Sequence, residues 1–301
     1  MPPLVNYDSP KELRAFLEAR GLGMRKKHGQ NFLVNPAVRS RLLDALELRP
    51  GDAVWEIGPG LGAMTAGLLE RGALVTAFEI DPAFAKALRE FFLPGHEAQE
   101  EPAAPAFRLV EGDVLKTWSA VGGQPLFLFG NLPYNIAATL LADFIGKGRF
   151  FTRMVVTVQR EVAQRMAARP GSPDYSSFSV LCSSVYTVTP LPVIKPASFY
   201  PAPRVDSQGM RLDLDVSRAK LPRLFYPLVR SLFSSRRKTI KNTLSNFAAS
   251  VILKPGPGAG TECAVEVLRR TGISAERRPE TLSIDEFAAL AAFLEETVFN
   301  G

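Results

Sequence analysis

Short apolar runs alternate with amphipathic stretches through the first half of the chain. The apolar runs are followed by glycine or polar residues, which is typical of strands buried in a sheet. We predict strands at residues 53–57, 74–79, 107–110, 126–129 and 154–158, and helices at 64–70, 82–92, 139–145 and 161–168. This alternation predicts an α/β fold on a mostly parallel, doubly wound sheet.

The two ends of the chain follow other patterns. Ser9 and Asn35, each followed by proline, predict helix starts, and the polar residues 26–33 between these helices are interpreted as a loop. Residues 186–214 are rich in β-branched residues and proline, which predicts antiparallel strands that close the sheet. Beyond Arg218 the pattern is helical. We therefore predict a large domain at 1–215 and a small helical domain at 216–301.

Composition excludes several classes of protein. The chain has 301 residues, 46% of them hydrophobic, which excludes disorder as the main state. Its two cysteines and two histidines form no zinc-binding spacing, so we expect no metal site. The N-terminus has no leader pattern, and no run approaches the roughly 18 apolar residues of a membrane span. We expect a cytoplasmic, monomeric protein that does not bind membranes.

Positive charge is concentrated in two segments without acidic residues, 19–43 and 216–261, although the net charge is only +6. Such runs are often solvated helix faces, but they also suit binding of a phosphate backbone. On the second interpretation, the candidate nucleic-acid contacts are Arg25, Lys26, Lys27, Arg230, Arg236, Arg237, Lys238 and Lys241.

A glycine turn, Gly58-Pro-Gly60-Leu-Gly62, follows the first predicted strand, and Glu79 ends the second. Such a turn lets a ligand approach the backbone, and a carboxylate about 20 residues later can bind both hydroxyls of a ribose. A tight strand-to-helix junction is the plainer interpretation. The third glycine of the dinucleotide fingerprint is absent, which favours S-adenosylmethionine over NAD. Asp113, after the third strand, could receive the adenine of the same ligand.

The fourth strand leads into Asn131-Leu132-Pro133-Tyr134. This pattern can be an ordinary turn, since Asn and Pro both favour turns. It also lies where open α/β sheets bind ligands. An asparagine amide can accept hydrogen bonds from an exocyclic amine and a tyrosine can stack on a base, so the motif suits methylation of an adenine amino group.

The motifs together resemble the ribosomal RNA small-subunit adenine dimethyltransferases. The resemblance covers nearly the whole chain and is carried by residues 27–33, 56–60, 79–81, 112–113, 130–134, 199–207, 236–239 and 278–283. It implies a Rossmann-like methyltransferase domain with a small rRNA-binding domain. It further implies N6,N6-dimethylation of two adjacent adenines in the 3′-terminal hairpin of 16S rRNA, on a precursor of the 30S subunit, with S-adenosylmethionine as methyl donor.

The resemblance also implies site residues. Those expected to bind the cofactor are Gln30, Asn31, Leu33, Gly58, Gly60, Glu79, Ile80, Asp113, Val114 and Asn131. Those expected around the target adenine are Asn131, Leu132, Pro133, Tyr134 and Phe199. For Phe199, packing in the core is an equally good interpretation.

Three alternatives stay open. The target could be 23S rRNA, as in the macrolide-resistance enzymes, although Leu132 and the arginine-rich tail argue against this. The chain could be an RNA-binding assembly or transcription factor without catalysis, although Glu79, Asp113, Asn131 and Tyr134 are intact. A nicotinamide oxidoreductase is the last alternative, but the sequence lacks a plausible proton-transfer pair.

Overall fold

The computed structural model describes residues 5–22, 31–93, 106–132, 136–218, 221–235, 237–252 and 256–299. The chain forms two compact units, and neither is contiguous in sequence. The first consists of Met1–Phe144, Arg149–Ala163 and Val188–Leu214. The second consists of Ile145–Gly148, Gln164–Thr187 and Asp215–Gly301. The second unit thus takes in two segments that precede residue 216, and from the longer of them Ala168, Tyr175 and Val180 pack with the C-terminal helices.

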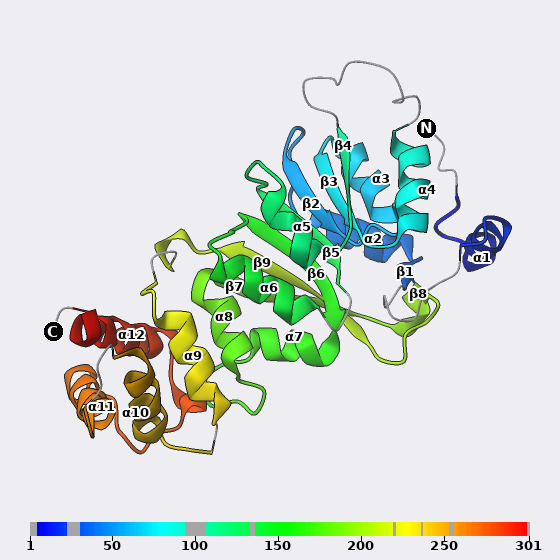
Figure 1. The fold of residues 1–301 in the computed structure, drawn as a ribbon. Coiled ribbons are helices and arrows are strands. Elements are labelled where there is room, and N and C mark those ends of the chain that lie inside the picture. The colour runs from blue at the N-terminus through cyan, green and yellow to red at the C-terminus, as the bar shows by residue number, and fades with distance from the viewer. Residues whose placement is uncertain are drawn as a thin grey trace. The chain divides into compact units, whose positions relative to one another are not determined.

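A seven-stranded sheet in the order β4-β3-β2-β5-β6-β9-β7 forms the centre of the first unit (Figure 1). Its strands are β2 (Ala53–Ile57), β3 (Leu74–Glu79), β4 (Phe107–Glu111), β5 (Phe127–Asn131), β6 (Arg153–Gln159), β7 (Tyr186–Ile194) and β9 (Ser207–Leu214). The strands from β4 to β6 are parallel, and β9 pairs with β6 in the antiparallel direction. The prediction of a mostly parallel sheet with antiparallel closing strands is confirmed.

Helices follow the strands in alternation, as the pattern predicts. Those up to the end of the parallel strands are α1 (Pro10–Ala19), α2 (Pro36–Asp44), α3 (Ala63–Glu70), α4 (Pro82–Phe92), α5 (Val114–Thr117), α6 (Ala137–Gly146) and α7 (Arg160–Ala167). The Ser9 hydroxyl accepts a hydrogen bond from the Glu12 N–H and caps α1. Asn35 caps α2 in the same way.

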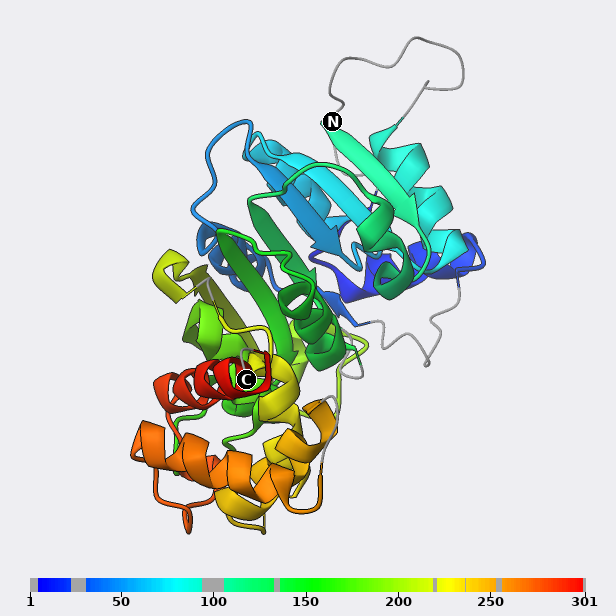
Figure 2. The same ribbon diagram turned by 60° about the vertical axis from the view of Figure 1, so that its left-hand side comes forward.

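Both faces of the parallel sheet are covered, as Figure 2 shows for the cyan, blue and green strands. On one face, leucines of α2, α3 and α4 pack with alternate strand residues such as Val54 and Phe129. On the other, the Trp55 ring lies 4.9 Å from that of Phe78 and 6.3 Å from that of Phe144 in α6. Successive side chains along each strand point to opposite faces of the sheet, so each strand contributes to both apolar layers.

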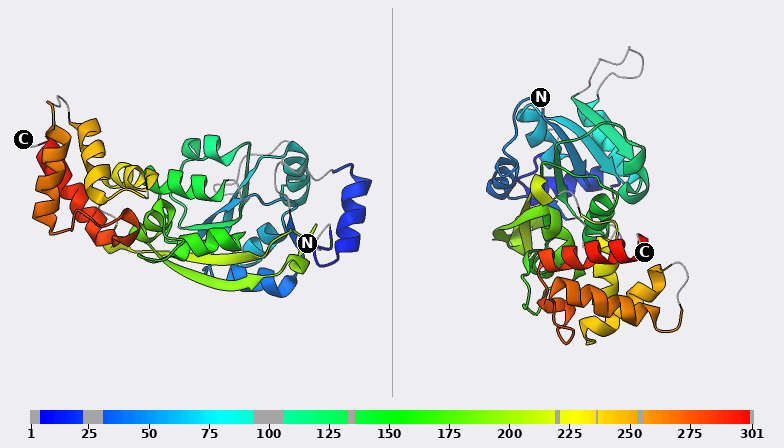
Figure 3. Two further views of the ribbon diagram at one scale, coloured as in Figure 1. Left: turned by 90° about the horizontal axis from the view of Figure 1, so that it is seen from below. Right: turned by 90° about the vertical axis from the view of Figure 1, so that its left-hand side faces the viewer.

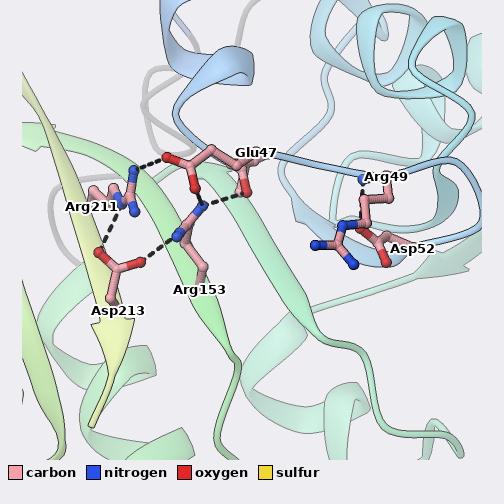
Figure 4. A network of polar contacts seen from close by, with 7 residues as sticks. Glu47, Arg49, Asp52, Arg153, Arg211 and Asp213 are labelled. Carbon is pink, nitrogen blue, oxygen red and sulfur yellow. Dashed lines mark hydrogen bonds and ion pairs between the residues drawn. The ribbon is translucent and has the colours of Figure 1, made fainter.

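A ring of four charged side chains anchors the turn after α2 to β6 and β9 (Figure 4). Arg153 contacts Glu47 at 2.6 Å and Asp213 at 2.5 Å. Arg211 contacts the same two carboxylates at 2.6 and 2.7 Å. Hydrogen bonds from Arg211 and Arg153 lower the pKa of Glu47. The helix before this turn ends at Asp44, and within the turn Glu47 takes a left-handed φ of 53°.

A second, two-stranded sheet was not predicted. Strand β1 (Phe32–Leu33) pairs antiparallel with β8 (Phe199–Tyr200), so the expected loop at 26–33 ends in a strand. The connection from β7 to β9 likewise contains β8. Two residues are too few to produce a detectable alternation, which is why the pattern predicts only a loop at 26–33.

The second unit contains α8 (Ser177–Val185), α9 (Phe225–Ser234), α10 (Ile240–Val251), α11 (Ala259–Thr271) and α12 (Ile284–Phe299). Figure 3 shows α9 to α12 in yellow, orange and red. Their apolar faces share one core, to which α8 contributes Val180. Within this core, the Tyr175 hydroxyl donates a hydrogen bond of 3.0 Å to the Leu282 carbonyl. Of the helices described, none is long and apolar enough to span a membrane.

Candidate functional site

A pocket opens at the carboxyl ends of β2, β3, β5 and β6, entirely within the first unit. Its empty space is about 810 Å³ with the open mouth included. The lining residues are Asn31, Phe32, Leu33, Glu56, Gly58, Pro59, Gly60, Ala63, Met64, Glu79, Ile80, Phe129, Asn131 and Thr157. The neighbours β2 and β5 are where the strand order reverses, the position at which open α/β sheets bind ligands.

The glycine turn forms one wall of this pocket. Gly58, Gly60 and Gly62 have φ values of 71°, 59° and 86°, in the left-handed region that other residues rarely adopt. A Cβ on Gly60 would lie 3.0 Å from the Phe32 ring. The glycines therefore allow both the turn and the close approach of β1, and they leave room for a ligand beside the backbone.

Glu79 presents a buried carboxylate to the pocket. Only 4% of the residue is exposed. Its oxygens accept hydrogen bonds from the Asp81 N–H at 2.8 Å and the Gly60 N–H at 3.1 Å. A carboxylate can accept about four hydrogen bonds, so it retains capacity for ligand hydroxyls. Beside it, Ile80 is 45% exposed and offers an apolar surface. These groups fit the ribose and the base of an adenosine.

Glu56 is a second buried carboxylate in the pocket wall, and it was not predicted as a site residue. It accepts a hydrogen bond of 2.6 Å from the Thr65 hydroxyl. Burial raises its pKa to about 8, and the nearby charge of Glu79 adds to the effect. Burial likewise raises the pKa of Glu79 to about 7. Both groups therefore hold protons in the folded protein at pH values where the unfolded chain has released them.

This proton uptake predicts a pH-dependent stability. As pH rises from about 5 to about 8, the free energy of unfolding should fall, by at most about 1.4 kcal/mol per pH unit for each carboxyl. Glu56→Gln should flatten the slope above pH 7. Urea unfolding can be followed by the fluorescence of Trp55 and Trp118, both in the first unit. Glu70→Gln, at an exposed position, is the control, and an unchanged slope in Glu56→Gln would contradict the prediction.

Asn131 lies at the end of β5 with its amide held on two sides. Its Nδ2 donates to the Asn31 carbonyl at 3.0 Å, and its Oδ1 accepts from the Thr157 hydroxyl. Thr157 is the register partner of Asn131 on β6. Thr157 was not predicted as a site residue, although a polar side chain within the apolar run 154–158 is a signal that marks it in the sequence.

The pocket brings together seven of the predicted cofactor residues: Asn31, Leu33, Gly58, Gly60, Glu79, Ile80 and Asn131. Asp113 and Val114 do not line it. The Asp113 carboxylate caps α5 by accepting from the Leu115 N–H at 3.0 Å, and Val114 is buried. The preceding Gly112 N–H donates to the Glu79 carbonyl at 2.8 Å, so this turn adjoins the end of β3.

Two residues expected near the target base are packed inside the first unit. Phe199 is 5% exposed and belongs to the core with Leu33 and Leu42, because the pairing of β8 with β1 turns it inward. Core packing therefore describes the position of Phe199 in this structure, and its contact with the target base stays a prediction. Leu132 is 2% exposed and packs over Gly130, so its backbone rather than its side chain can face a ligand.

Several predicted residues lie outside the described part of the chain: Arg25, Lys26, Lys27, Gln30, Pro133, Tyr134 and Arg236. Of the first basic segment, Arg20 pairs with Glu90 and Arg39 with Asp8, so two of its cations serve contacts within the protein.

The cations on α9, on α10 and in the connection between them differ from these. Arg230, Arg237, Lys238 and Lys241 are exposed and pair with no acidic group among the described residues. In the same described part, no group of three or more His, Cys, Asp or Glu side chains could hold a metal ion.

Comparison with known proteins gives matches that span the chain. The family model for ribosomal RNA adenine dimethylase matches residues 21–280. A Treponema denticola protein named ribosomal RNA small subunit methyltransferase A is 43% identical over 295 residues, covering 96% of this chain and 95% of the relative. A protein of that name from Borreliella burgdorferi is 36% identical, covering 95% and 94%.

Solved structures agree in fold. A dimethyladenosine transferase from Plasmodium falciparum superposes with a TM-score of 0.71 at 24% identity, covering 88% of this chain and 98% of that chain. The 23S rRNA methyltransferase ErmE gives 0.61 at 24% identity, covering 87% and 99%. The Rossmann-like methyltransferase fold expected from the sequence is thus confirmed. The family model and the near full-length relatives show that this chain belongs to the ribosomal RNA adenine dimethylase family, whose enzymes take their methyl groups from S-adenosylmethionine.

Proposed function

We propose that this enzyme dimethylates N6 of two adjacent adenines in the 3′-terminal hairpin of 16S rRNA. The observation that carries the proposal is the 43% identity to a small subunit methyltransferase A over 96% of the chain, which includes both units. The pocket geometry supports it, because the Asn131 amide lies beside a cavity whose other groups fit an adenosine. We propose a precursor of the 30S subunit in the cytoplasm as the substrate and a monomer as the active form.

In this proposal the pocket residues bind the cofactor through distinct contacts. Glu79 accepts from the ribose hydroxyls, Ile80 packs against the adenine, and the backbone at Gly58 and Gly60 approaches the methionine part. The bound cofactor supplies a methyl group on a sulfonium, which is a good leaving group. Asn31 and Leu33, on the segment that pairs with β8, cover the site and exclude water.

Asn131 then acts on the target amine. Adenine N6 needs no strong base, but its lone pair must be drawn out of conjugation with the ring and pointed at the methyl carbon. The Asn131 Oδ1 can accept from one N6 hydrogen and a backbone carbonyl from the other. Dipoles fixed in this way stabilise the positive charge that develops on N6 as the bond forms. We propose that Tyr134 stacks on the extruded base.

The test is methylation of purified ribosomal particles. Unmodified 30S particles, 50S particles and free 16S rRNA are each incubated with enzyme and S-adenosylmethionine, and methylated adenines are mapped by mass spectrometry. We expect two adjacent dimethyladenosines near the 3′ end of 16S rRNA. Modification of 23S rRNA would favour the macrolide-resistance alternative, and no methyl transfer to any particle would overturn the proposal.

The two cations in the connection between α9 and α10 give a separate prediction. If Arg237 and Lys238 contact phosphates, Arg237→Gln with Lys238→Gln should lower the slope of log affinity against log salt by up to about 2, since each phosphate contact contributes about 0.7–0.9. The measurement is filter binding to 30S particles between 50 and 200 mM salt. The matched control is Arg14→Gln with Arg269→Gln, two exposed arginines paired with neighbouring glutamates. An equal slope in both double variants would contradict the phosphate contacts.

A further inference from the structure

We propose that Thr157 is a positioning residue, whose hydroxyl fixes the orientation of the Asn131 amide for methyl transfer. This inference rests on the proposed function and extends it to a residue outside the recognised motifs. It assigns a role to a buried polar side chain, 1% exposed, that lies within the apolar run 154–158 of β6. Burying a hydroxyl group costs free energy unless it is hydrogen-bonded, so the hydrogen-bond partner of this side chain indicates its role.

Thr157 is tied to Asn131 by both backbone and side chain. The two residues are register partners in parallel strands β5 and β6. The N–H of Leu132, the next residue, donates to the Thr157 carbonyl at 3.0 Å, and the Thr157 hydroxyl donates to the Asn131 Oδ1. The position of the hydroxyl relative to the amide is therefore set by the sheet and not by a mobile loop.

The directions of these hydrogen bonds are determined by the groups involved. The Asn31 carbonyl can only accept, so the amide atom that faces it must be Nδ2. Oδ1 therefore faces Thr157, and because an amide oxygen carries no hydrogen, the threonine must be the donor. Together the two contacts leave the amide one orientation. It retains a second lone pair on Oδ1 and a second hydrogen on Nδ2 for the substrate.

The alternative orientation shows what the threonine prevents. With the amide turned over, Oδ1 would face the Asn31 carbonyl oxygen, and two acceptors would oppose each other. Without the Thr157 hydroxyl, the contact with Asn31 alone would hold the amide, and Oδ1 would lose the partner that aims it. A single neutral hydrogen bond contributes about 1–1.4 kcal/mol, which corresponds to roughly a fivefold to tenfold change in rate.

Thr157→Val tests the proposal, because valine keeps the shape and branching of threonine and removes only the donor. We expect kcat on 30S particles to fall roughly fivefold to tenfold. The Kd for S-adenosylmethionine and the KM for particles should stay within about twofold of wild type, because the lost hydrogen bond acts in the transition state and not in substrate binding. Thr157→Ser, which restores the hydroxyl, should recover most of kcat. Thr76→Val makes the same change at a half-buried position on β3, away from the pocket, and should leave kcat unchanged.

Each other outcome overturns the inference. A wild-type kcat in Thr157→Val would show that the hydroxyl does not position Asn131. Equal losses in the valine and serine variants would indicate packing, and a loss of cofactor affinity with kcat retained at saturation would make Thr157 a cofactor contact. The wild-type enzyme is assayed in parallel. If it fails to modify 30S particles, the proposed function fails, whereas an active wild type with unaffected variants refutes only the role of Thr157.

Discussion

Asn131→Ala should lower kcat by roughly 100- to 1,000-fold, the loss typical of removing one preorganised dipole at a reacting centre. Alanine removes both the acceptor for the N6 hydrogen and the contact with Asn31, while the neighbouring strands β2 and β6 remain paired with β5. Single-turnover methylation of 30S particles measures the rate. Binding of the same particles, measured by filter retention, should stay within about twofold of wild type, since the phosphate contacts that dominate affinity are untouched.

The control for this experiment is Asn242→Ala, an exposed asparagine on α10. It should leave both the rate and the binding unchanged. A parallel loss of methylation, particle binding and thermal stability in Asn131→Ala would show instead that the residue maintains the fold. Asn131→Asp adds a second check. A carboxylate cannot donate to the Asn31 carbonyl, so this nearly isosteric variant should also be impaired.

Glu79→Gln should weaken binding of S-adenosylmethionine by roughly 10- to 100-fold, because hydrogen bonds to a charged acceptor contribute about 1.5–3 kcal/mol. The amide of glutamine also has to direct its NH2 group at one of two backbone donors, from Gly60 or Asp81. Titration calorimetry with the purified enzyme measures the affinity. Glu70→Gln, at an exposed position at the end of α3, is the matched control.

Wild type and Glu79→Gln should also differ in how their affinity for S-adenosylmethionine depends on pH. Burial raises the pKa of Glu79 to about 7, so the carboxyl is increasingly protonated below that pH and loses acceptor capacity. We therefore expect the affinity of wild type for the cofactor to rise between pH 6 and 8, and that of Glu79→Gln to rise less. Equal affinities at pH 8 in the two proteins would contradict the role of Glu79 as the ribose ligand.

Local sequence patterns predicted the centre of the fold well and its edges poorly. Strands β2 and β3 begin and end where the apolar runs do, because buried parallel strands are continuous in hydrophobicity. The glycine turn, Glu79 and Asn131 could be predicted as pocket residues because each lies at the carboxyl end of such a strand. Helix α8 was not predicted, because the serines at 177, 179, 183 and 184 interrupt the helical spacing of its apolar residues.

Contacts between distant residues could not be predicted in this way. The link between Asn131 and Asn31 joins positions 100 residues apart, and the bond from Thr157 depends on the register of β5 with β6. Phe199 illustrates the same limit. Its motif is shared with rRNA dimethyltransferases, but whether its ring faces a base or the core depends on the pairing of β8 with β1. A motif indicates which residues matter, whereas the register determines where each side chain points.

The pairing of β1 with β8 also constrains how the protein is made. Leu33 and Phe199 are more than 160 residues apart, so a ribosome adding about 5–20 residues per second needs roughly 8–30 s to synthesise the partner strand after the first has appeared. The parallel strands from β2 to β6 can assemble during that interval. The sheet of β1 and β8, which holds Leu33 over the pocket, cannot form until β8 has been synthesised. We expect a nascent chain to gain affinity for S-adenosylmethionine only after β8 has left the ribosomal tunnel, late in synthesis.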